Sequence, residues 1–161
     1  MKVGDYSGRV AVSIHGRAEI AQAARLMLDQ HVRFLVVHKE GDDLRRPIGV
    51  LTDRDIVLKG TACGIEAASV MVEDVMTREP FVARDSDELS DVLQTMKKAG
   101  IRRVPVVDLR GALVGIIAMD EVIGVVAGFD LRHGGLDQER TAPRTALSRR
   151  LRHSRRASSA S

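Results

Sequence analysis

The sequence predicts an α/β fold made of two consecutive copies of a β-α-β-β-α unit. Three observations support this fold class. Two long stretches of the chain align with each other residue by residue, which indicates an internal repeat. Each copy contains a stretch whose apolar residues follow the i, i+3, i+4, i+7 spacing of an amphipathic helix. Each of these helices is followed by two short runs rich in β-branched residues, which are typical of strands.

The repeat covers most of each copy. Residues 17–37, RAEIAQAARLMLDQHVRFLVV, align with residues 86–107, SDELSDVLQTMKKAGIRRVPVV, and PIGVLTDRDIV aligns further on with LVGIIAMDEVI. The first copy is slightly longer in its polar loop EGDDLRR, where insertions are tolerated. A unit of about 60 residues buries little surface alone, so we expect the copies to stack and share a core. The aligned pairs are Glu19/Glu88, Met27/Met96, Arg33/Arg102, Val37/Val106, Gly49/Gly115, Val50/Ile116 and Asp55/Glu121.

Each copy has the same order of elements. A short extended segment is followed by a helix, by two strands joined through a polar loop that contains glycine, and by a second helix. In the first copy these are Val10–Ile14, a helix with its apolar stripe on Ile20, Ala23, Ala24 and Met27, the strands Phe34–His38 and Ile48–Leu51, and a helix near Arg54–Lys59. In the second copy they are Phe81–Ala83, a helix with its stripe on Leu89, Val92, Leu93 and Met96, the strands Val104–Val107 and Leu113–Ile117, and a helix near Asp120–Ala127.

These elements place the first unit at residues 7–62 and the second at residues 77–129. Residues 63–76 between them are predicted to be a linker with helical character. Beyond residue 129 the apolar periodicity ends. Residues 130–161 are predicted to be a basic, mostly disordered tail, because they offer almost nothing to bury.

The tail also explains the charge of the chain. Residues 140–161 contain seven arginines and no acidic residue, so the rest of the chain has 18 basic and 22 acidic residues and is mildly acidic. Such a tail is typically a solubilising segment, although it could also bind nucleic acid or anionic lipid electrostatically. The tail segment RRAS around Ser158 is similar to a basophilic kinase site. Aromatic residues make up only 2% of the chain, which argues against recognition of nucleic acid by base stacking.

The sequence predicts a cytoplasmic protein. The first ten residues, MKVGDYSGRV, lack the apolar core of a signal peptide. The longest apolar stretch, Leu113–Phe129, is interrupted by Asp120 and Glu121, so it is not expected to span a membrane. Its segment VIGVVAGF suits either a core helix or a helix buried against another subunit. Cys63 is the only cysteine, so an internal disulfide is impossible and a reducing compartment fits.

The tetrad from Thr52 to Asp55 follows directly after an apolar strand, and two interpretations suit it. Thr52 as N-cap and Asp55 three residues later form a capping box, which satisfies free backbone amides with no ligand present. A nucleoside phosphate also suits these residues. One carboxylate can accept hydrogen bonds from both hydroxyls of a ribose, while a hydroxyl and helix amides suit a phosphate. The residues alone leave both interpretations open, and the two are partly compatible.

No catalytic or metal-binding signature is present in the sequence. The five histidines (His15, His31, His38, His133 and His153) lack metal-ligand spacing, and Cys63 has no partner cysteine. The chain contains neither a P-loop motif nor a nucleophile elbow. We therefore expect a protein without an enzymatic activity of its own.

The chain resembles the CBS domain family, named after cystathionine β-synthase. VEDVMTREPFVARDSDELSDVLQTMKKAGIRRVPVVD followed by ALVGIIAMDEV resembles one CBS motif, and the first copy, which ends in PIGVLTDRDIV, resembles another. The similarity covers about residues 7–128. It rests on VMT before the first strand, RRVPVVD in the second and Gly-apolar-apolar-Thr-x-x-Asp at the third. The pair is similar to modules in IMP dehydrogenase, in the γ subunit of AMP-activated kinase and in stand-alone bacterial proteins.

The resemblance implies two CBS motifs packed as a pseudo-two-fold CBS pair with clefts between the paired sheets. Such clefts bind adenosyl ligands, so AMP, ADP, ATP, S-adenosylmethionine (SAM) or NAD is the expected ligand and regulation is the expected function. The resemblance also implies a homodimer formed through the helices of the pair, which could act on an unidentified regulated protein. The alternative is a dimeric protein-interaction module with degenerate, non-binding clefts. Binding of nucleic acid through the tail is the least favoured function.

The resemblance also assigns roles to particular residues. Asp55 would bind the ribose and Thr52 would lie near the phosphate. Arg102 and Arg103 would reach the phosphates; otherwise they would form an exposed basic edge or pair with Asp85 and Asp87. The second copy departs from the motif, because Ala118 replaces the threonine and Glu121 replaces the aspartate, so one good site and one weakened or empty site are expected. The remaining assigned residues are Pro80, Phe81 and Val82, whose backbone would flank the adenine, and Arg33, which would lie near the phosphates.

Overall fold

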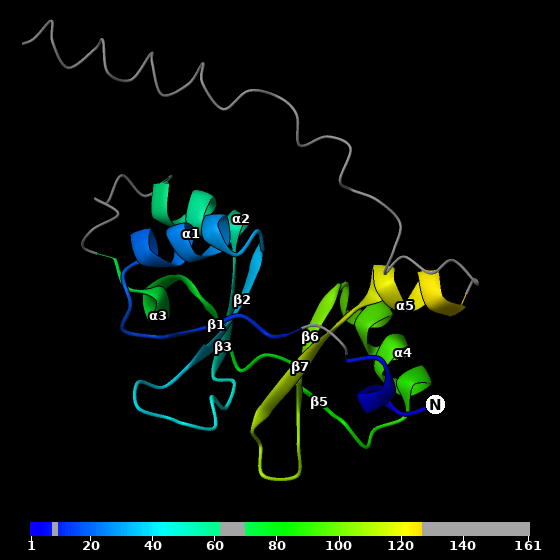
Figure 1. The fold of residues 1–161 in the computed structure, drawn as a ribbon. Helices are drawn as coiled ribbons and strands as arrows, with labels where there is room; N and C mark the ends of the chain where they lie inside the picture. The colour runs from blue at the N-terminus through cyan, green and yellow to red at the C-terminus, as the bar shows by residue number, and fades with distance from the viewer. Residues whose placement is uncertain (8–9, 62–69, 127–161) are drawn as a thin grey trace, which may run out of the picture.

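Two β-sheets, each covered by its own helices, form the part of the chain that the computed structural model describes, residues 1–7, 10–61 and 70–126 (Figure 1). The predicted tail, Cys63 and the first half of the predicted linker lie outside these residues. The predicted α/β fold class is confirmed, and so is the β-α-β-β-α order of both copies. None of the helices in these three ranges is long and apolar enough to cross a membrane.

The first sheet has four strands in the order β1-β2-β3-β4. β1 runs parallel to β2, whereas the β2–β3 and β3–β4 pairs are antiparallel. Helix α2 continues directly into a π-helical turn, η2. The elements of this half are β1 (Ser13–His15), α1 (Ile20–Asp29), β2 (Phe34–His38), β3 (Gly49–Thr52), α2 (Asp53–Asp55), η2 (Ile56–Thr61), α3 (Val72–Val75) and β4 (Thr77–Arg78).

The second sheet has three strands in the order β5-β6-β7, with β5 parallel to β6 and β6 antiparallel to β7. A short 3-10 turn, η1 (Val3–Asp5), packs beside β5 although it precedes the first copy in the sequence. The other elements are β5 (Ala83–Arg84), α4 (Leu89–Ala99), β6 (Arg103–Val107), β7 (Leu113–Ala118) and α5 (Met119–Val126).

The first strand of each copy is shorter than predicted and begins later. Val10–Ile14 was expected to be extended, but only Ser13–His15 pairs with β2; Phe81–Ala83 was expected, but only Ala83–Arg84 pairs with β6. A strand is defined by its partner, and sequence patterns do not show where a partner strand ends. Phe81 lies on the stretch between β4 and β5, outside both ladders.

The core consists of three apolar clusters, one in each half and one between the halves. The first lies between the first sheet and α1, and the second lies between the second sheet, α4 and α5. A third cluster joins the two sheets, because Phe34 and Val36 of β2 pack with Ile116 of β7 and with Ala11. Leu35 lies one residue from Phe34 and Val36 and belongs to the first cluster, so β2 is buried on both faces. The two copies therefore share an apolar interface, as the repeat predicts.

The copies also exchange the short segments that lead into them. Val3, which precedes the first copy, is fully buried in the core of the second and donates its N–H to Asp87 O (3.0 Å). Val72, which precedes the second copy, is fully buried in the core of the first and donates its N–H to Ala18 O (2.8 Å). Each half is thus completed by a helical turn that belongs to the other half in the sequence.

Candidate functional site

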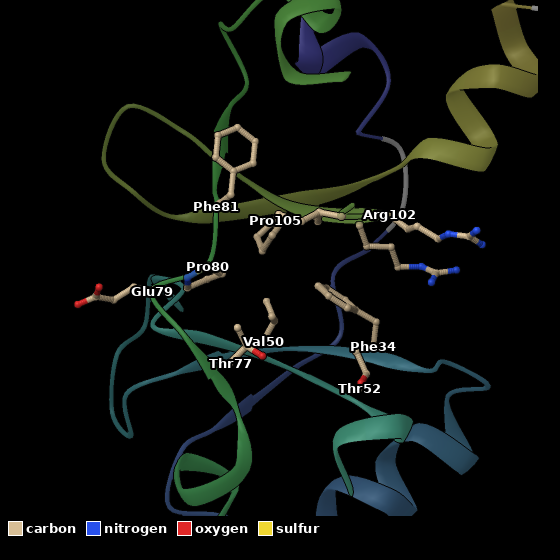
Figure 2. A pocket seen from close by; sticks show the side chains of 11 residues that line it. Phe34, Val50, Thr52, Thr77, Glu79, Pro80, Phe81, Arg102 and Pro105 are labelled. Atoms are coloured by element: carbon tan, nitrogen blue, oxygen red, sulfur yellow. The ribbon is translucent and has the colours of Figure 1, made fainter. Parts of the chain in front are cut away.

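A cleft of about 390 Å³ lies between the two sheets, and residues from both copies line it (Figure 2). Its volume falls in the range typical of sites for small molecules. The lining is mainly apolar or aromatic in the middle and carries charged side chains at its ends. The lining residues are Phe34, Val50, Thr52, Thr77, Glu79, Pro80, Phe81, Ile101, Arg102, Arg103 and Pro105.

The first sheet supplies one wall of the cleft through its strand register. Phe34 on β2 lies opposite Thr52 on β3, and Val36 lies opposite Val50. Directly opposed residues of an antiparallel pair point to the same face of the sheet, so Phe34, Val50 and Thr52 share the face that meets the second sheet. The other walls come from the segment that joins β4 to β5 and from the start of β6.

The cleft has opposite charges at its two ends. In Figure 2 the carboxylate of Glu79 extends at one end, whereas the side chain of Arg102 extends at the opposite end. Glu79 has φ 48°, in the left-handed region that residues with a Cβ rarely adopt, and its N–H donates to Ile48 O (3.3 Å). An unusual backbone at a cleft wall is typical of functional sites. The cleft therefore suits a flat apolar group flanked by polar ends.

The Thr52–Asp55 tetrad forms the predicted capping box. Asp55 Oδ2 accepts hydrogen bonds from the Thr52 N–H (3.0 Å) and from the Thr52 hydroxyl (2.6 Å), and the Asp55 N–H donates to Thr52 Oγ1 (3.2 Å). The hydroxyl of Thr52 therefore uses its only proton in the hydrogen bond to Asp55. Thr52 Oγ1 can then take part in further hydrogen bonds only as an acceptor. Thr52 lines the cleft, whereas Asp55 is half-buried beside it and is not among the lining residues.

The environment of Asp55 lowers its pKa. Partial burial alone would raise the pKa of this carboxyl, but the hydrogen bonds from Thr52 and the nearby Lys59 ammonium outweigh burial and hold the pKa below its ordinary value of 3.8. Lys59 Nζ lies 3.2 Å from Asp55 Oδ1. Asp55 is therefore charged at neutral pH and bound on both of its oxygens.

Asp55 is expected to make the fold more sensitive to acid. Because folding lowers this pKa, the ionised cap stabilises the protein above about pH 4, and the contribution disappears as the pH falls through the folded-state pKa. Asp55→Asn should cost about 1 kcal/mol near neutral pH, as for other lost caps. It should also lose less stability than the wild type between about pH 6 and about pH 3. Urea unfolding at both pH values measures this difference.

The exposed Asp43 in the loop after β2 provides the matched control for this measurement. Asp43→Asn should follow the wild-type dependence on pH, because no hydrogen bond to this carboxylate forms among the described residues. Equal acid sensitivity of the Asp55→Asn variant and the wild type would contradict a stabilising role for the ionised cap.

The three arginines assigned by the resemblance differ in their partners. Arg33 Nε lies 2.6 Å from Asp53 Oδ2, and Arg103 Nη2 lies 4.0 Å from Asp120 Oδ2. Within residues 1–7, 10–61 and 70–126, the guanidinium of Arg102 has no carboxylate within 4.0 Å.

Met119 explains the difference between Arg33 and Arg102. Met119 occupies the position that Asp53 has in the first copy, and each donates its backbone N–H to the carbonyl of the corresponding arginine. Neither Arg102 nor Arg103 forms the alternative ion pairs with Asp85 or Asp87 in this part of the chain.

The structure brings five of the nine assigned residues together in one cleft: Thr52, Pro80, Phe81, Arg102 and Arg103. The other four do not line it: Asp55, Val82, Arg33 and Glu121. Glu121 lies in the first turn of α5, where Asp55 lies in α2 of the other copy, and Ala118 at the end of β7 takes the place of Thr52. The second copy therefore has no hydroxyl at the position that corresponds to Thr52, the residue that caps α2 in the first copy.

Six lining residues were missed from the sequence: Phe34, Val50, Thr77, Glu79, Ile101 and Pro105. Phe34 carried a usable signal, because the hairpin register places it opposite Thr52. Glu79 carried none, because its place at the cleft depends on how the chain crosses between the sheets. Among the described residues, no three or more His, Cys, Asp or Glu side chains are grouped to hold a metal ion.

Comparison with known proteins identifies the family. The CBS domain family matches residues 3–60 and 72–128, which together make up more than half of the chain. The chain belongs to the CBS domain family. Two consecutive CBS domains agree with the two copies read from the sequence and with the paired sheets of the structure. The predicted resemblance to a CBS pair is thus confirmed.

Relatives of this CBS pair include bacterial and archaeal proteins. The CBS domain-containing protein YhcV of Bacillus subtilis is 38% identical over 103 residues, which are 64% of this chain and 69% of YhcV. The uncharacterized protein MK0525 of Methanopyrus kandleri is 28% identical over 125 residues, which are 78% of this chain. The matched part covers 62% of MK0525, so the chain spans less than two thirds of that relative.

Among solved structures, the CBS domain pair of protein MJ0100 has the same fold, with a TM-score of 0.67 and 25% identity. The match covers 80% of this chain and 97% of the MJ0100 pair. MJ0100 was crystallised in complex with 5′-methylthioadenosine and S-adenosyl-L-methionine. The paired architecture of MJ0100 thus holds adenosyl ligands.

Proposed function

We propose that this CBS pair is a regulatory module, without catalysis of its own, that binds an adenosyl ligand in the cleft between its two sheets. AMP, ADP, ATP, SAM and NAD are the candidate ligands. The ligands bound by MJ0100 support the adenosyl class. A cytoplasmic location and a regulated partner protein belong to the same proposal.

Arg102 at the end of an apolar cleft carries this proposal, because its guanidinium has no carboxylate within 4.0 Å in the described part of the chain. A flat adenine fits among Pro80, Phe81 and Pro105, and a phosphate then lies at the Arg102 end, where the guanidinium offers paired N–H donors. Thr52 also lines the cleft and can accept a hydrogen bond from a ribose hydroxyl, because it donates its own hydroxyl proton in the hydrogen bond to Asp55. We therefore propose that Thr52 contacts the ribose, whereas the resemblance implies a place near the phosphate.

Asp55 keeps its proposed role as a second ribose acceptor. It is one turn from the cleft, and its carboxylate is engaged by Thr52 and Lys59. The ribose hydroxyls can bind this carboxylate once the Asp55 side chain has given up some of its present hydrogen bonds. Ligand binding at Asp55 therefore includes a local rearrangement of the α2 cap.

Thermal denaturation with a ligand panel tests the proposal. A ligand at about 100 times its Kd should add about 2.7 kcal/mol, or roughly 5–10 °C for a protein of this size. The panel contains AMP, ADP, ATP, SAM and NAD, with inorganic phosphate as a control. A binding ligand whose shift is unchanged in Asp55→Ala would remove Asp55 from the site. An unchanged melting temperature with every ligand would contradict the proposal as a whole.

A dimeric protein-interaction module is the second candidate function. Exposed apolar side chains on the helices favour it: Val57 is 59% exposed and Leu58 52% exposed on η2, and Ile123 is 59% exposed on α5. Such residues are typical of helix faces covered by another chain. Light scattering together with the ligand panel separates the two functions. A stable dimer without any ligand shift would favour the interaction module.

A further inference from the structure

Lys59 connects the candidate site to the junction between the two copies. Its Nζ donates a hydrogen bond to Val75 O (2.8 Å) and lies 3.2 Å from Asp55 Oδ1. Val75 is the last residue of α3, where backbone carbonyls lack helical partners, and the lysine satisfies one of them. The chain continues from α3 into Thr77, which lines the cleft. One ammonium group thus holds both the capping carboxylate and the segment that leads into a wall of the cleft.

The carboxylate of Asp55 has little capacity left for a ligand. A carboxylate offers about four acceptor sites. Thr52 uses two of them on Oδ2 through its N–H and its hydroxyl, and Lys59 uses one on Oδ1. A ribose diol brings two hydroxyl donors, so at least one present partner has to leave before both can bind.

Lys59 is the partner that costs least to displace. The hydrogen bonds from Thr52 are local, part-buried and as short as 2.6 Å, and they cap α2. The Lys59 side chain is 47% exposed, and its contact with Asp55 is longer. Ion pairs with this exposure contribute little stability, because water solvates the released ammonium.

We propose that Lys59 is a positioning residue that competes with the ribose of the ligand for Asp55 and thereby links occupancy of the cleft to α3. With the cleft empty, Lys59 holds the Asp55 carboxylate at its cap and Val75 at the end of α3. When the ribose binds, Lys59 leaves Asp55 and its hold on Val75 changes. This inference rests on the proposed function, because it requires a ribose at Asp55.

Removing the lysine charge is expected to tighten ligand binding. In Lys59→Met and Lys59→Gln the ribose no longer competes for Asp55, so AMP should bind about two- to fivefold more tightly, the size expected for one half-exposed ion pair. Adenosine should show the same gain, because the effect acts at the ribose. 2′,3′-Dideoxy-AMP should bind the variants and the wild type equally, since it lacks both hydroxyls. Lys59→Arg should stay close to the wild type. Isothermal titration with these three probes measures each change.

Lys39→Met is the matched control, because Lys39 is exposed beyond the far end of β2 and has no ion pair within the described residues.

Hydrogen exchange provides a second readout. AMP should change the protection of Val75 and Met76 amides in the wild type but much less in Lys59→Gln. If AMP binds the wild type and Lys59→Gln equally, or the variant more weakly, the Lys59 proposal is wrong while the proposed function stands. Equal gains for AMP and dideoxy-AMP would also overturn it. If neither adenosine nor any ligand of the panel binds the wild type, the proposed function fails and the competition fails with it.

Discussion

Replacing Arg102 by glutamate is expected to weaken AMP binding on the order of tenfold to a hundredfold and to leave adenosine binding almost unchanged. Hydrogen bonds to a charged group contribute about 1.5–3 kcal/mol, and each 1.4 kcal/mol is about tenfold in Kd. Arg102 is the arginine of the cleft without a carboxylate within 4.0 Å in the described part of the chain. Its full charge is therefore available to a phosphate. Titration with AMP and with adenosine at one fixed salt concentration measures the difference.

Two variants control this experiment. Arg110→Glu makes the same charge change at an exposed position in the loop between β6 and β7 and should leave both affinities unchanged. Arg33→Glu removes a guanidinium that Asp53 already neutralises and should weaken AMP far less than Arg102→Glu. Equal losses for AMP and adenosine in Arg102→Glu would place the phosphate elsewhere. Equal losses in Arg102→Glu and Arg110→Glu would reduce the effect to net charge.

Replacing Val3 by aspartate is expected to destabilise the second copy by about 3–5 kcal/mol, the cost of an unpaired buried charge. Val3 is fully buried in the apolar cluster that includes Ala83, Leu89 and Val104, so a carboxylate there would be surrounded by apolar side chains. The loss is a large fraction of the stability of a typical domain, which is about 5–15 kcal/mol. Urea unfolding measures it, and hydrogen exchange shows where protection is lost first. The amides of β6 should lose protection more than those of β2.

Leu109→Asp is the control, because Leu109 is 84% exposed in the loop of the second copy and tolerates a charge. Val72→Asp should give the reverse pattern, with greater loss of protection in β2, since Val72 is buried in the first copy. A Val3→Asp protein that loses protection chiefly in the first copy would show that the entry segments are not exchanged in solution.

The sequence predicted the fold well because its signals are local and occur twice. The apolar spacing around Ile20 and Leu89 predicted α1 and α4, and the runs at Phe34 and Val104 predicted β2 and β6. Thr52 and Asp55 predicted a cap that the structure contains. In each case the deciding interactions join residues close in sequence, or the repeat supplied a second copy of the pattern.

The cleft was only partly predictable because distant segments meet there. Arg102 and Thr52 were found through their motifs, but Glu79 reaches the cleft only through the crossing of the chain between the sheets. The exchange of Val3 and Val72 was not foreseen either, since each packs on the copy farther along or farther back in the sequence. The hydrogen bond from Lys59 to Val75 O joins residues 16 apart in the sequence, and no sequence pattern shows it.

The exchanged entry segments impose an order on folding during synthesis. Val3 is made long before Asp87 and Leu89, so it stays without its packing partners while the whole first copy is translated. Completion of the first sheet is also delayed, because α3 and β4 are synthesised after the segment that joins the copies. Contacts of such long sequence separation slow folding and expose unfinished sheet edges meanwhile. A truncated translation product that stops before β4 should therefore be a target for chaperones and proteases.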